Sequence, residues 1–299
     1  MAHSIALPAA PARWRSYLEL TKPRVVALML FTVLVGMLLA APAKQPPHWQ
    51  VLLFGTLGIA LVAAAAAALN HLIDQRVDGL MARTRARPLP RGALRSAQVA
   101  AFAAVLGAIG TALLLAFTNG LCALLTLASL VGYAGVYSLW LKRATPHNIV
   151  IGGAAGAAPP LLGWVAVTGQ VDPGALALFL IIVLWTPPHF WALAIHRRDE
   201  YARAAIPMLP VTHGVAFTCG RILFYAALLW AVSLLPFAIG IGHTLYLVGA
   251  CVLGAGFVER AWRLRRDERL ALPTFRYSIV YLAALFALLL LDHWLSGAS

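Results

Sequence analysis

The chain has 299 residues, of which 62 % are apolar and only 11 % are charged. Soluble domains are nearer half apolar and a quarter charged, so this composition excludes an ordinary soluble enzyme and a disordered chain. The charge is one-sided, with 23 Lys and Arg against 10 Asp and Glu and a formal net charge of +13. Because long apolar runs separate the basic residues, we interpret the excess as a membrane topology signal and not as a nucleic-acid surface.

Nine apolar segments approach or reach the length of about 20 residues that crosses a hydrocarbon core. In chain order they lie at 25–41, 51–70, 98–116, 121–140, 149–168, 174–195, 222–241, 244–258 and 277–295. No ten-residue alternating pattern typical of a membrane barrel appears. The sequence therefore predicts an all-α, polytopic membrane protein with nine transmembrane helices.

The basic residues fall almost entirely on one side of this arrangement. The tail before the first span and the second, fourth, sixth and eighth connections carry 22 of the 23 Lys and Arg residues, and only Lys44 falls on the other side. By the positive-inside rule, the N-terminus is cytoplasmic and the C-terminus is outside. We expect residues 1–16 to form a flexible cytoplasmic tail and residues 17–299 to form one transmembrane domain.

The second span leads into the segment NHLIDQRVD, residues 70–78. If the helix continues through it, Asn70, Asp74 and Asp78 share one face at positions i, i+4 and i+8. Two carboxylates and an amide oxygen beside a basic loop suit Mg²⁺ that is held partly by protein and partly by phosphate oxygens. The alternative is that the acids only balance nearby arginines. Ionisable groups at a membrane boundary usually have a function, which favours the metal site.

A second acidic cluster, Asp199 and Glu200 with Tyr201, follows the sixth span. A structural i, i+4 pair between Asp199 and Arg203 is the simpler interpretation of it. However, both clusters follow parallel spans and lead through arginines into a proline-leucine turn. This similarity predicts two pseudo-repeated four-helix halves plus one helix, which would place the second cluster beside the first.

Basic residues near the acidic clusters are candidates for contacts with a diphosphate, since a guanidinium group matches phosphate geometry. We expect about half of them to act only as topology signals. The candidates are Lys22, Arg24, Arg83, Arg87, Lys142, Arg143, Arg197, Arg198 and Arg203.

Two histidines are candidates for contact with a metalloporphyrin. His189 lies within the sixth span, and His196 lies seven residues further on roughly the same face. A histidine inside a span is more often an interhelical hydrogen-bond donor than a ligand, so both interpretations stay open.

Taken together, these motifs resemble the UbiA-type intramembrane prenyltransferases and, within them, the haem O synthase family. The resemblance covers roughly residues 17–291. It rests on the blocks LTKPRV (20–25), NHLIDQRVD (70–78), MARTRARPL (81–89), LKRATPHNIVIGG (141–153), GAAPP (156–160), GW (163–164), WTPPHFW (185–191), RDEY (198–201) and PMLP (207–210). The adjacent Asp199 and Glu200 depart from the two spaced aspartates common in the superfamily, and Tyr201 stands where an acid is frequent.

The resemblance implies an enzyme that transfers a farnesyl group from farnesyl diphosphate to a vinyl group of haem B, with addition of water, to give haem O. It implies Mg²⁺ as the cofactor, held by Asn70, Asp74 and Asp78 together with Asp199 and Glu200. These residues and Tyr201 would form the catalytic centre, with Tyr201 orienting the diphosphate or stabilising a cation by its ring face.

The same resemblance implies haem B and membrane lipid as partners, no nucleic acid, and haem A synthase or oxidase assembly factors as further partners. It places the chain in the inner membrane with the active site facing the cytoplasm. One alternative is a prenyltransferase acting on an aromatic acid or a quinone precursor. A transporter is a second alternative, although the charged residues gather on one side with no partner at the membrane midplane.

Overall fold

A computed structural model describes residues 13–79, 84–141, 145, 148–203 and 206–296. These residues form helices, turns and connections but no strand, and nine of their helical segments are long and apolar enough to cross a membrane. Helices satisfy their own backbone hydrogen bonds, which the hydrocarbon core cannot do for them. The prediction of an all-α, nine-span membrane protein is therefore confirmed.

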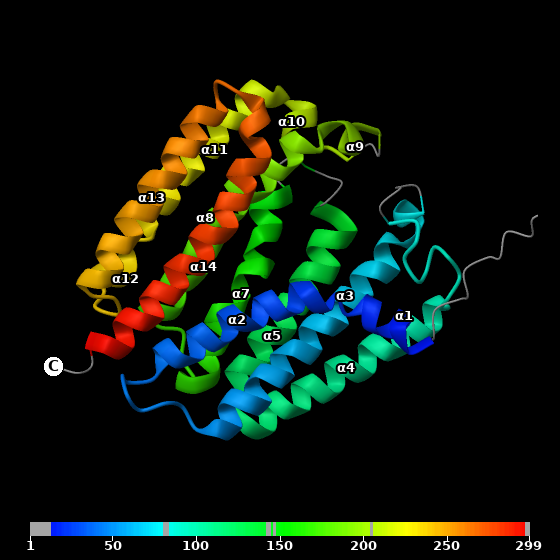
Figure 1. Cartoon of the computed structure of the whole chain (residues 1–299). Helices are drawn as coiled ribbons and strands as arrows, with labels where there is room; N and C mark the ends of the chain where they lie inside the picture. Colours follow the sequence, from blue (N-terminus) through cyan, green and yellow to red (C-terminus); the bar gives the residue numbers. More distant parts are fainter. Residues whose placement is uncertain (1–12, 80–83, 142–144, 146–147, 204–205, 297–299) are drawn as a thin grey trace, which may run out of the picture.

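Figure 1 shows the helices in chain order. The first part of the chain forms α1 (Arg13–Leu20), α2 (Pro23–Ala40), η1 (Val51–Gly55), α3 (Thr56–Asp78), α4 (Ser96–Phe117), α5 (Gly120–Val131) and the π-helical segment η2 (Gly132–Leu141). The second part forms α7 (Asn148–Thr168), α8 (Pro173–His196), α9 (Arg198–Arg203), α10 (Leu209–Thr212), α11 (Gly214–Val232), α12 (Leu235–Ala238), α13 (Thr244–Leu264), η3 (Glu268–Leu270) and α14 (Ala271–Ser296).

Helix α7 joins the two parts of the bundle, because it packs against both α2 and α8. Its contact with α2 is a backbone contact. A Cβ atom added at Gly36 of α2 would collide with the carbonyl of Pro160, and one added at Gly163 of α7 would collide with the carbonyl of Val33. Small residues let membrane helices approach this closely. The close van der Waals packing stabilises the helix pair, because in lipid no hydrophobic effect drives helices together.

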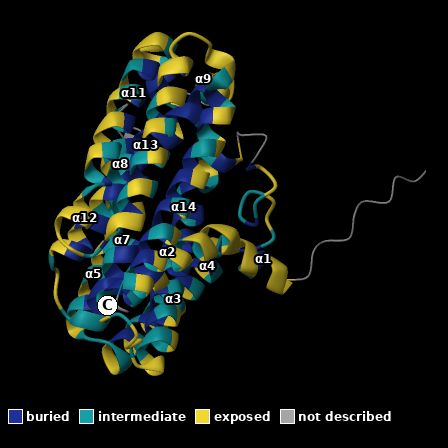
Figure 2. Cartoon of the chain, turned by 60° about the vertical axis from the view of Figure 1, so that its left-hand side comes forward, coloured by how far each residue is buried: buried dark blue, intermediate teal, exposed yellow. Residues whose placement is uncertain are grey.

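The outward faces of the helices are apolar. Large side chains such as Leu124, Trp140 and Val252 are more than 60 % exposed, and Figure 2 shows exposed residues along the outer faces with buried residues between the helices. A soluble protein rarely exposes so much contiguous apolar surface. These faces are suited to contact with lipid.

Besides the second span, which ends at Asp78 and not at 70, three spans begin or end several residues away from the sequence prediction. The seventh begins at Gly214 and not at 222, the eighth ends at Leu264 and not at 258, and the ninth begins at Glu268 and not at 277. In the seventh and eighth spans the added turns carry arginines that lie over aromatic rings, with Arg221 4.9 Å from the centre of Phe217 and Arg260 3.8 Å from that of Tyr277. Such stacking lets a charged side chain stay on the helix while its head reaches water.

The helix ends that carry the predicted site residues lie on one side of the molecule. In Figure 1 the end of α3, the end of η2, the start of α7 and α9 all lie toward the upper right. This agrees with an alternating arrangement of spans. The orientation of the N-terminus, the division at residue 17 and the pseudo-repeat stay predictions.

Candidate functional site

A buried polar cluster lies at the end of α3. The helix continues through Asp78, so Asn70, Asp74 and Asp78 share one face as expected, and they are 5 %, 2 % and 4 % exposed. The Asn70 amide Nδ2 donates to Asp74 Oδ2 at 3.0 Å. Burying a carboxylate is unfavourable unless it is paired with a cation or binds a metal, so Asp74 and Asp78 need positively charged partners at this site.

The segment η2 fixes the orientation of the Asn70 amide. Asn70 Nδ2 also donates to Ser138 Oγ at 3.0 Å, and Ser138 Oγ donates to the carbonyl of Tyr133 at 2.8 Å. Because Asn70 Nδ2 faces Asp74 and Ser138, the amide oxygen Oδ1 points the other way, toward Lys22. π-Helical turns are rare and occur frequently at functional sites, and this one brings Ser138 to α3.

Among the described residues, two cations lie against the acidic face. Lys22 Nζ donates to Asn70 Oδ1 at 2.7 Å, and Arg87 Nη1 lies 2.7 Å from Asp78 Oδ2. Lys22 directly precedes α2 and has a left-handed backbone with φ 49°. Arg87 follows a turn in which Thr84 Oγ1 donates to the carbonyl of Asp78 at 2.9 Å. The cluster therefore contains both signs of charge within hydrogen-bonding distance.

His71 is a further member of the cluster that the sequence did not single out. It is 3 % exposed, and neither ring nitrogen has a hydrogen-bond partner among the described residues. It lies within electrostatic reach of Lys22, Arg87 and Asp74. Its position next to Asn70 in the motif was the available signal.

The residue types of this cluster suit a hard divalent cation. Mg²⁺ prefers carboxylate and amide oxygens and usually binds one or two carboxylates together with substrate phosphates and water. Within the described ranges, no three His, Cys, Asp or Glu side chains converge to hold a metal without further ligands. The oxygens of Asn70, Asp74 and Asp78 therefore fit a metal that a phosphate group helps to bind.

The second acidic cluster lies apart from the first. On α9 the Asp199 side chain is 86 % exposed and lies 3.7 Å from Arg198 Nε, and Glu200 is also exposed. Tyr201 is half-buried. The structure does not bring the two acids onto the α3 cluster, so their role as metal ligands stays a prediction. The Arg203 side chain bonds to the Asp199 carbonyl at 3.2 Å and not to its carboxylate.

Tyr137 lies between the two motifs. Asp74 and Tyr201 are both within electrostatic reach of its hydroxyl. Its ring packs on Gly152 of α7, where an added Cβ would collide with it, and stacks with Tyr133 at 5.8 Å between ring centres. Tyr137 is thus an additional candidate that sequence reasoning missed.

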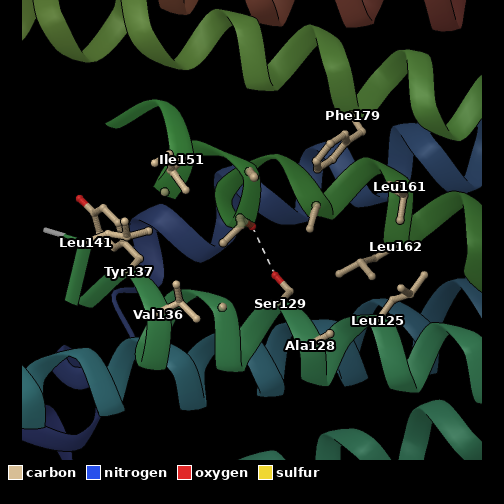
Figure 3. A pocket seen from close by; sticks show the side chains of 15 residues that line it. Leu125, Ala128, Ser129, Val136, Tyr137, Leu141, Ile151, Leu161, Leu162 and Phe179 are labelled. Atoms are coloured by element: carbon tan, nitrogen blue, oxygen red, sulfur yellow. Dashed lines mark hydrogen bonds between the residues drawn. The ribbon is translucent and has the colours of Figure 1, made fainter. Parts of the chain in front are cut away.

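An apolar cavity of about 350 Å³ extends from Tyr137 along α5, η2 and α7 (Figure 3). Leu125, Leu161, Leu162 and Phe179 line it away from Tyr137, and Ser129 contributes one hydroxyl, which donates to the carbonyl of Ala155 at 3.3 Å. The cavity has the character of a site for a hydrocarbon chain.

The remaining candidates occupy varied positions. His189 is buried between α8 and α14, with Nδ1 2.6 Å from Ser278 Oγ, whereas His196 is exposed at the end of α8. Arg24, Arg198 and Arg203 are exposed, and Arg197 is half-buried. Arg83, Lys142 and Arg143 lie outside the described residues. The roles of all these residues stay predictions.

Comparisons with known proteins agree with this picture. The model of the UbiA prenyltransferase family matches residues 29–291. A protein of Marinobacter nauticus named protoheme IX farnesyltransferase is 62 % identical over 288 residues, which are 96 % of this chain and 95 % of that protein. A structure of digeranylgeranylglyceryl phosphate synthase has a TM-score of 0.81 and 19 % identity, and covers 94 % of this chain and 99 % of its own. A UbiA homologue from Archaeoglobus fulgidus, solved with DMAPP and Mg²⁺, has a TM-score of 0.62 and 17 % identity, with 92 % and 99 % covered.

Proposed function

The chain belongs to the UbiA prenyltransferase family, and on that premise we propose that it transfers the farnesyl group of farnesyl diphosphate to a vinyl group of haem B, with addition of water, to give haem O. The relative named protoheme IX farnesyltransferase, similar over nearly the whole chain, supports this activity. The observation that carries the proposal is the buried cluster of both charges at the end of α3, placed beside an apolar cavity.

Asn70, Asp74 and Asp78 would hold Mg²⁺, which neutralises charge on the leaving diphosphate. The homologue solved with DMAPP and Mg²⁺ supports this choice of metal. Lys22 and Arg87 now contact the same acidic face, and they would donate to diphosphate oxygens. Cations fixed beside developing negative charge are the usual means of stabilising such a leaving group. The Asp199 and Glu200 cluster and the outer basic residues would complete the site from α9.

The farnesyl chain fits the apolar cavity, with its reacting end at Tyr137. The C–O bond breaks, and the diphosphate leaves with the electron pair. The vinyl π electrons then form a bond to the resulting allylic carbocation. Water adds to the new cation beside the porphyrin and loses a proton, which gives the hydroxyethylfarnesyl group. The lining excludes bulk water from the carbocation, and the electron-rich face of Tyr137 stabilises it.

Haem B would approach from the side of α8, where His189 and His196 are the proposed contacts. The one-sided distribution of the basic residues supports a position of the acidic clusters at the cytoplasmic face of the inner membrane, by the positive-inside rule. The exposed basic residues of α9 and the α13–α14 connection would contact anionic headgroups or assembly partners there.

The proposed activity is tested by incubating membranes that contain the full chain with haem B and farnesyl diphosphate, and then separating the haems by chromatography. We expect a slower-eluting haem that disappears when Mg²⁺ is chelated. Prenylation of an aromatic acid in place of haem, under the same conditions, would contradict the proposal.

A further inference from the structure

The ring of His189 is fixed by aromatic side chains. It is 8 % exposed, stacks on Trp185 with 4.0 Å between ring centres and 21° between planes, and lies 4.5 Å from the ring of Phe275. Phe190 meets it edge-on at 5.2 Å. Rotation of the imidazole would displace these neighbours, so packing alone sets the plane of the ring.

Ser278 on α14 determines which ring nitrogen carries hydrogen. Its Oγ lies 2.6 Å from His189 Nδ1 and 2.6 Å from the carbonyl oxygen of Phe275. A hydroxyl has one hydrogen to donate. Two oxygens this close repel unless a hydrogen lies between them, so the Ser278 hydrogen points to the Phe275 carbonyl. His189 Nδ1 must then carry its own hydrogen and donate to Ser278 Oγ.

The position of Ser278 is itself fixed from α8. The Trp185 indole Nε1 donates to the backbone carbonyl of Ser278 at 2.7 Å. Trp185 therefore stacks on His189 and also holds the residue that bonds to it. Two hydrogen bonds and one ring contact, between His189 and Phe275, join the same short stretch of α8 to the same turn of α14.

The Nδ1–H tautomer leaves His189 Nε2 with a lone pair. In the part of the chain that the structure describes, no residue hydrogen-bonds to Nε2. A neutral imidazole in this state is a ligand for iron, and the hydrogen bond at the other nitrogen is the usual means of setting the tautomer and raising ligand basicity.

We propose that Ser278 is a positioning residue, which holds His189 as the Nδ1–H tautomer so that Nε2 binds the iron of the haem substrate. This inference rests on the proposed function, because it takes haem as the substrate. It assigns a role to Ser278 in haem binding and none in diphosphate release. A purely structural role would instead join α8 to α14 without any effect on the iron.

The test uses the purified full-length chain in detergent, titrated with haem B in the absence of farnesyl diphosphate and followed by its absorption spectrum. We expect Ser278→Ala and His189→Ala to lose the spectrum of histidine-bound haem. Ser278→Ala should also bind haem about 10- to 100-fold more weakly, the usual cost of a lost residue behind a metal ligand. Added imidazole should restore the spectrum in His189→Ala. Ser278→Thr, which keeps the hydroxyl, should resemble the wild type.

Ser233→Ala is the matched control, since Ser233 is also buried and its hydroxyl joins α11 to Tyr281 of α14. It should leave the haem spectrum unchanged. If Ser278→Ala melts at a lower temperature than the wild type, the haem spectrum of Ser278→Cys is used in its place. This variant keeps the side-chain volume and only weakens the acceptor of the His189 Nδ1–H hydrogen bond. A wild-type haem spectrum in whichever of Ser278→Ala and Ser278→Cys is stably folded would overturn the inference. The same holds for a wild-type spectrum in His189→Ala without added imidazole.

The inference and the proposed function can fail separately. If the wild type makes haem O while these variants keep the wild-type spectrum, only the inference is wrong. If the wild type binds haem through His189 but makes no haem O, the proposed function is wrong.

Discussion

Lys22 Nζ donates to Asn70 Oδ1 at 2.7 Å, although the two residues are 48 positions apart in the chain. The bond joins the start of α2 to the end of α3 and places an ammonium group at the oxygen proposed to bind the metal. The positive φ of Lys22 shows that its backbone adopts a conformation that non-glycine residues rarely use. Strain of this kind persists where the surroundings enforce it, often at functional sites.

Replacing Lys22 by Met should lower kcat/KM for farnesyl diphosphate by about 10- to 100-fold. A hydrogen bond to a charged group is worth about 1.5–3 kcal/mol, and the variant loses one to the diphosphate. Steady-state kinetics with purified protein measures the effect. Lys44→Met is the control, since Lys44 also has a positive φ but lies on the predicted opposite side. Equal losses in both variants would show that the lysine acts only on folding or topology.

Replacing Arg87 by Gln should destabilise the protein by about 3 kcal/mol, because Asp78 would keep a buried charge without its main partner. The Arg87 side chain is 20 % exposed, so the ion pair is not fully removed from water. The expected loss of stability therefore lies at the lower end of the range for buried pairs. Thermal unfolding in detergent measures it. Asp78→Asn in the same chain should restore much of the stability while turnover stays lost. A double variant no more stable than Arg87→Gln would contradict the pairing.

Replacing Ser138 by Ala should reduce turnover about fivefold, the value of one neutral hydrogen bond of about 1 kcal/mol. Without Ser138, the Asn70 amide loses one of the contacts that direct its oxygen toward the cations. The control is Thr111→Val on α4, where the lost hydroxyl bonds only to its own helix. Unchanged kinetics in Ser138→Ala would mean that η2 does not orient Asn70.

Replacing Ala158 by Phe should shorten the cavity and change the preferred length of the prenyl chain. Ala158 lines the wall beyond Tyr137, so a phenyl ring there occupies space needed by a farnesyl tail but not by a geranyl tail. Competition between the two diphosphates, followed by mass spectrometry of the haems, measures the ratio. Ala112→Phe on the exposed face of α4 is the control. A ratio that stays at the wild-type value would place the tail elsewhere.

Much of the fold could be predicted from the sequence, because hydropathy and charge act over whole helices. Nine spans follow from apolar length, and the shared face of Asn70, Asp74 and Asp78 follows from helical spacing once α3 continues past the apolar run. The start of the seventh span and the end of the eighth did not follow, since arginines that stack on Phe217 and Tyr277 remain on helices.

The site could be predicted only in part. Lys22 and Arg87 were candidates as basic residues, but their partners depend on how α2 and the turn after α3 fold back. Ser138 and Tyr137 were missed, because a π-helical segment changes the register that regular spacing assumes. Asp199 and Glu200 were expected beside the first cluster, whereas the structure places them on an exposed short helix.

The most direct test of the account is the amount of haem O formed by the full-length wild type and by Asp74→Asn from haem B and farnesyl diphosphate with Mg²⁺. Asp172→Asn, at the start of α8 away from the cluster, is the matched control. We predict haem O in the wild type and the control, and none above background in Asp74→Asn at equal amounts of folded protein. Haem O at the wild-type level in Asp74→Asn, or its absence in the wild type, would contradict the account.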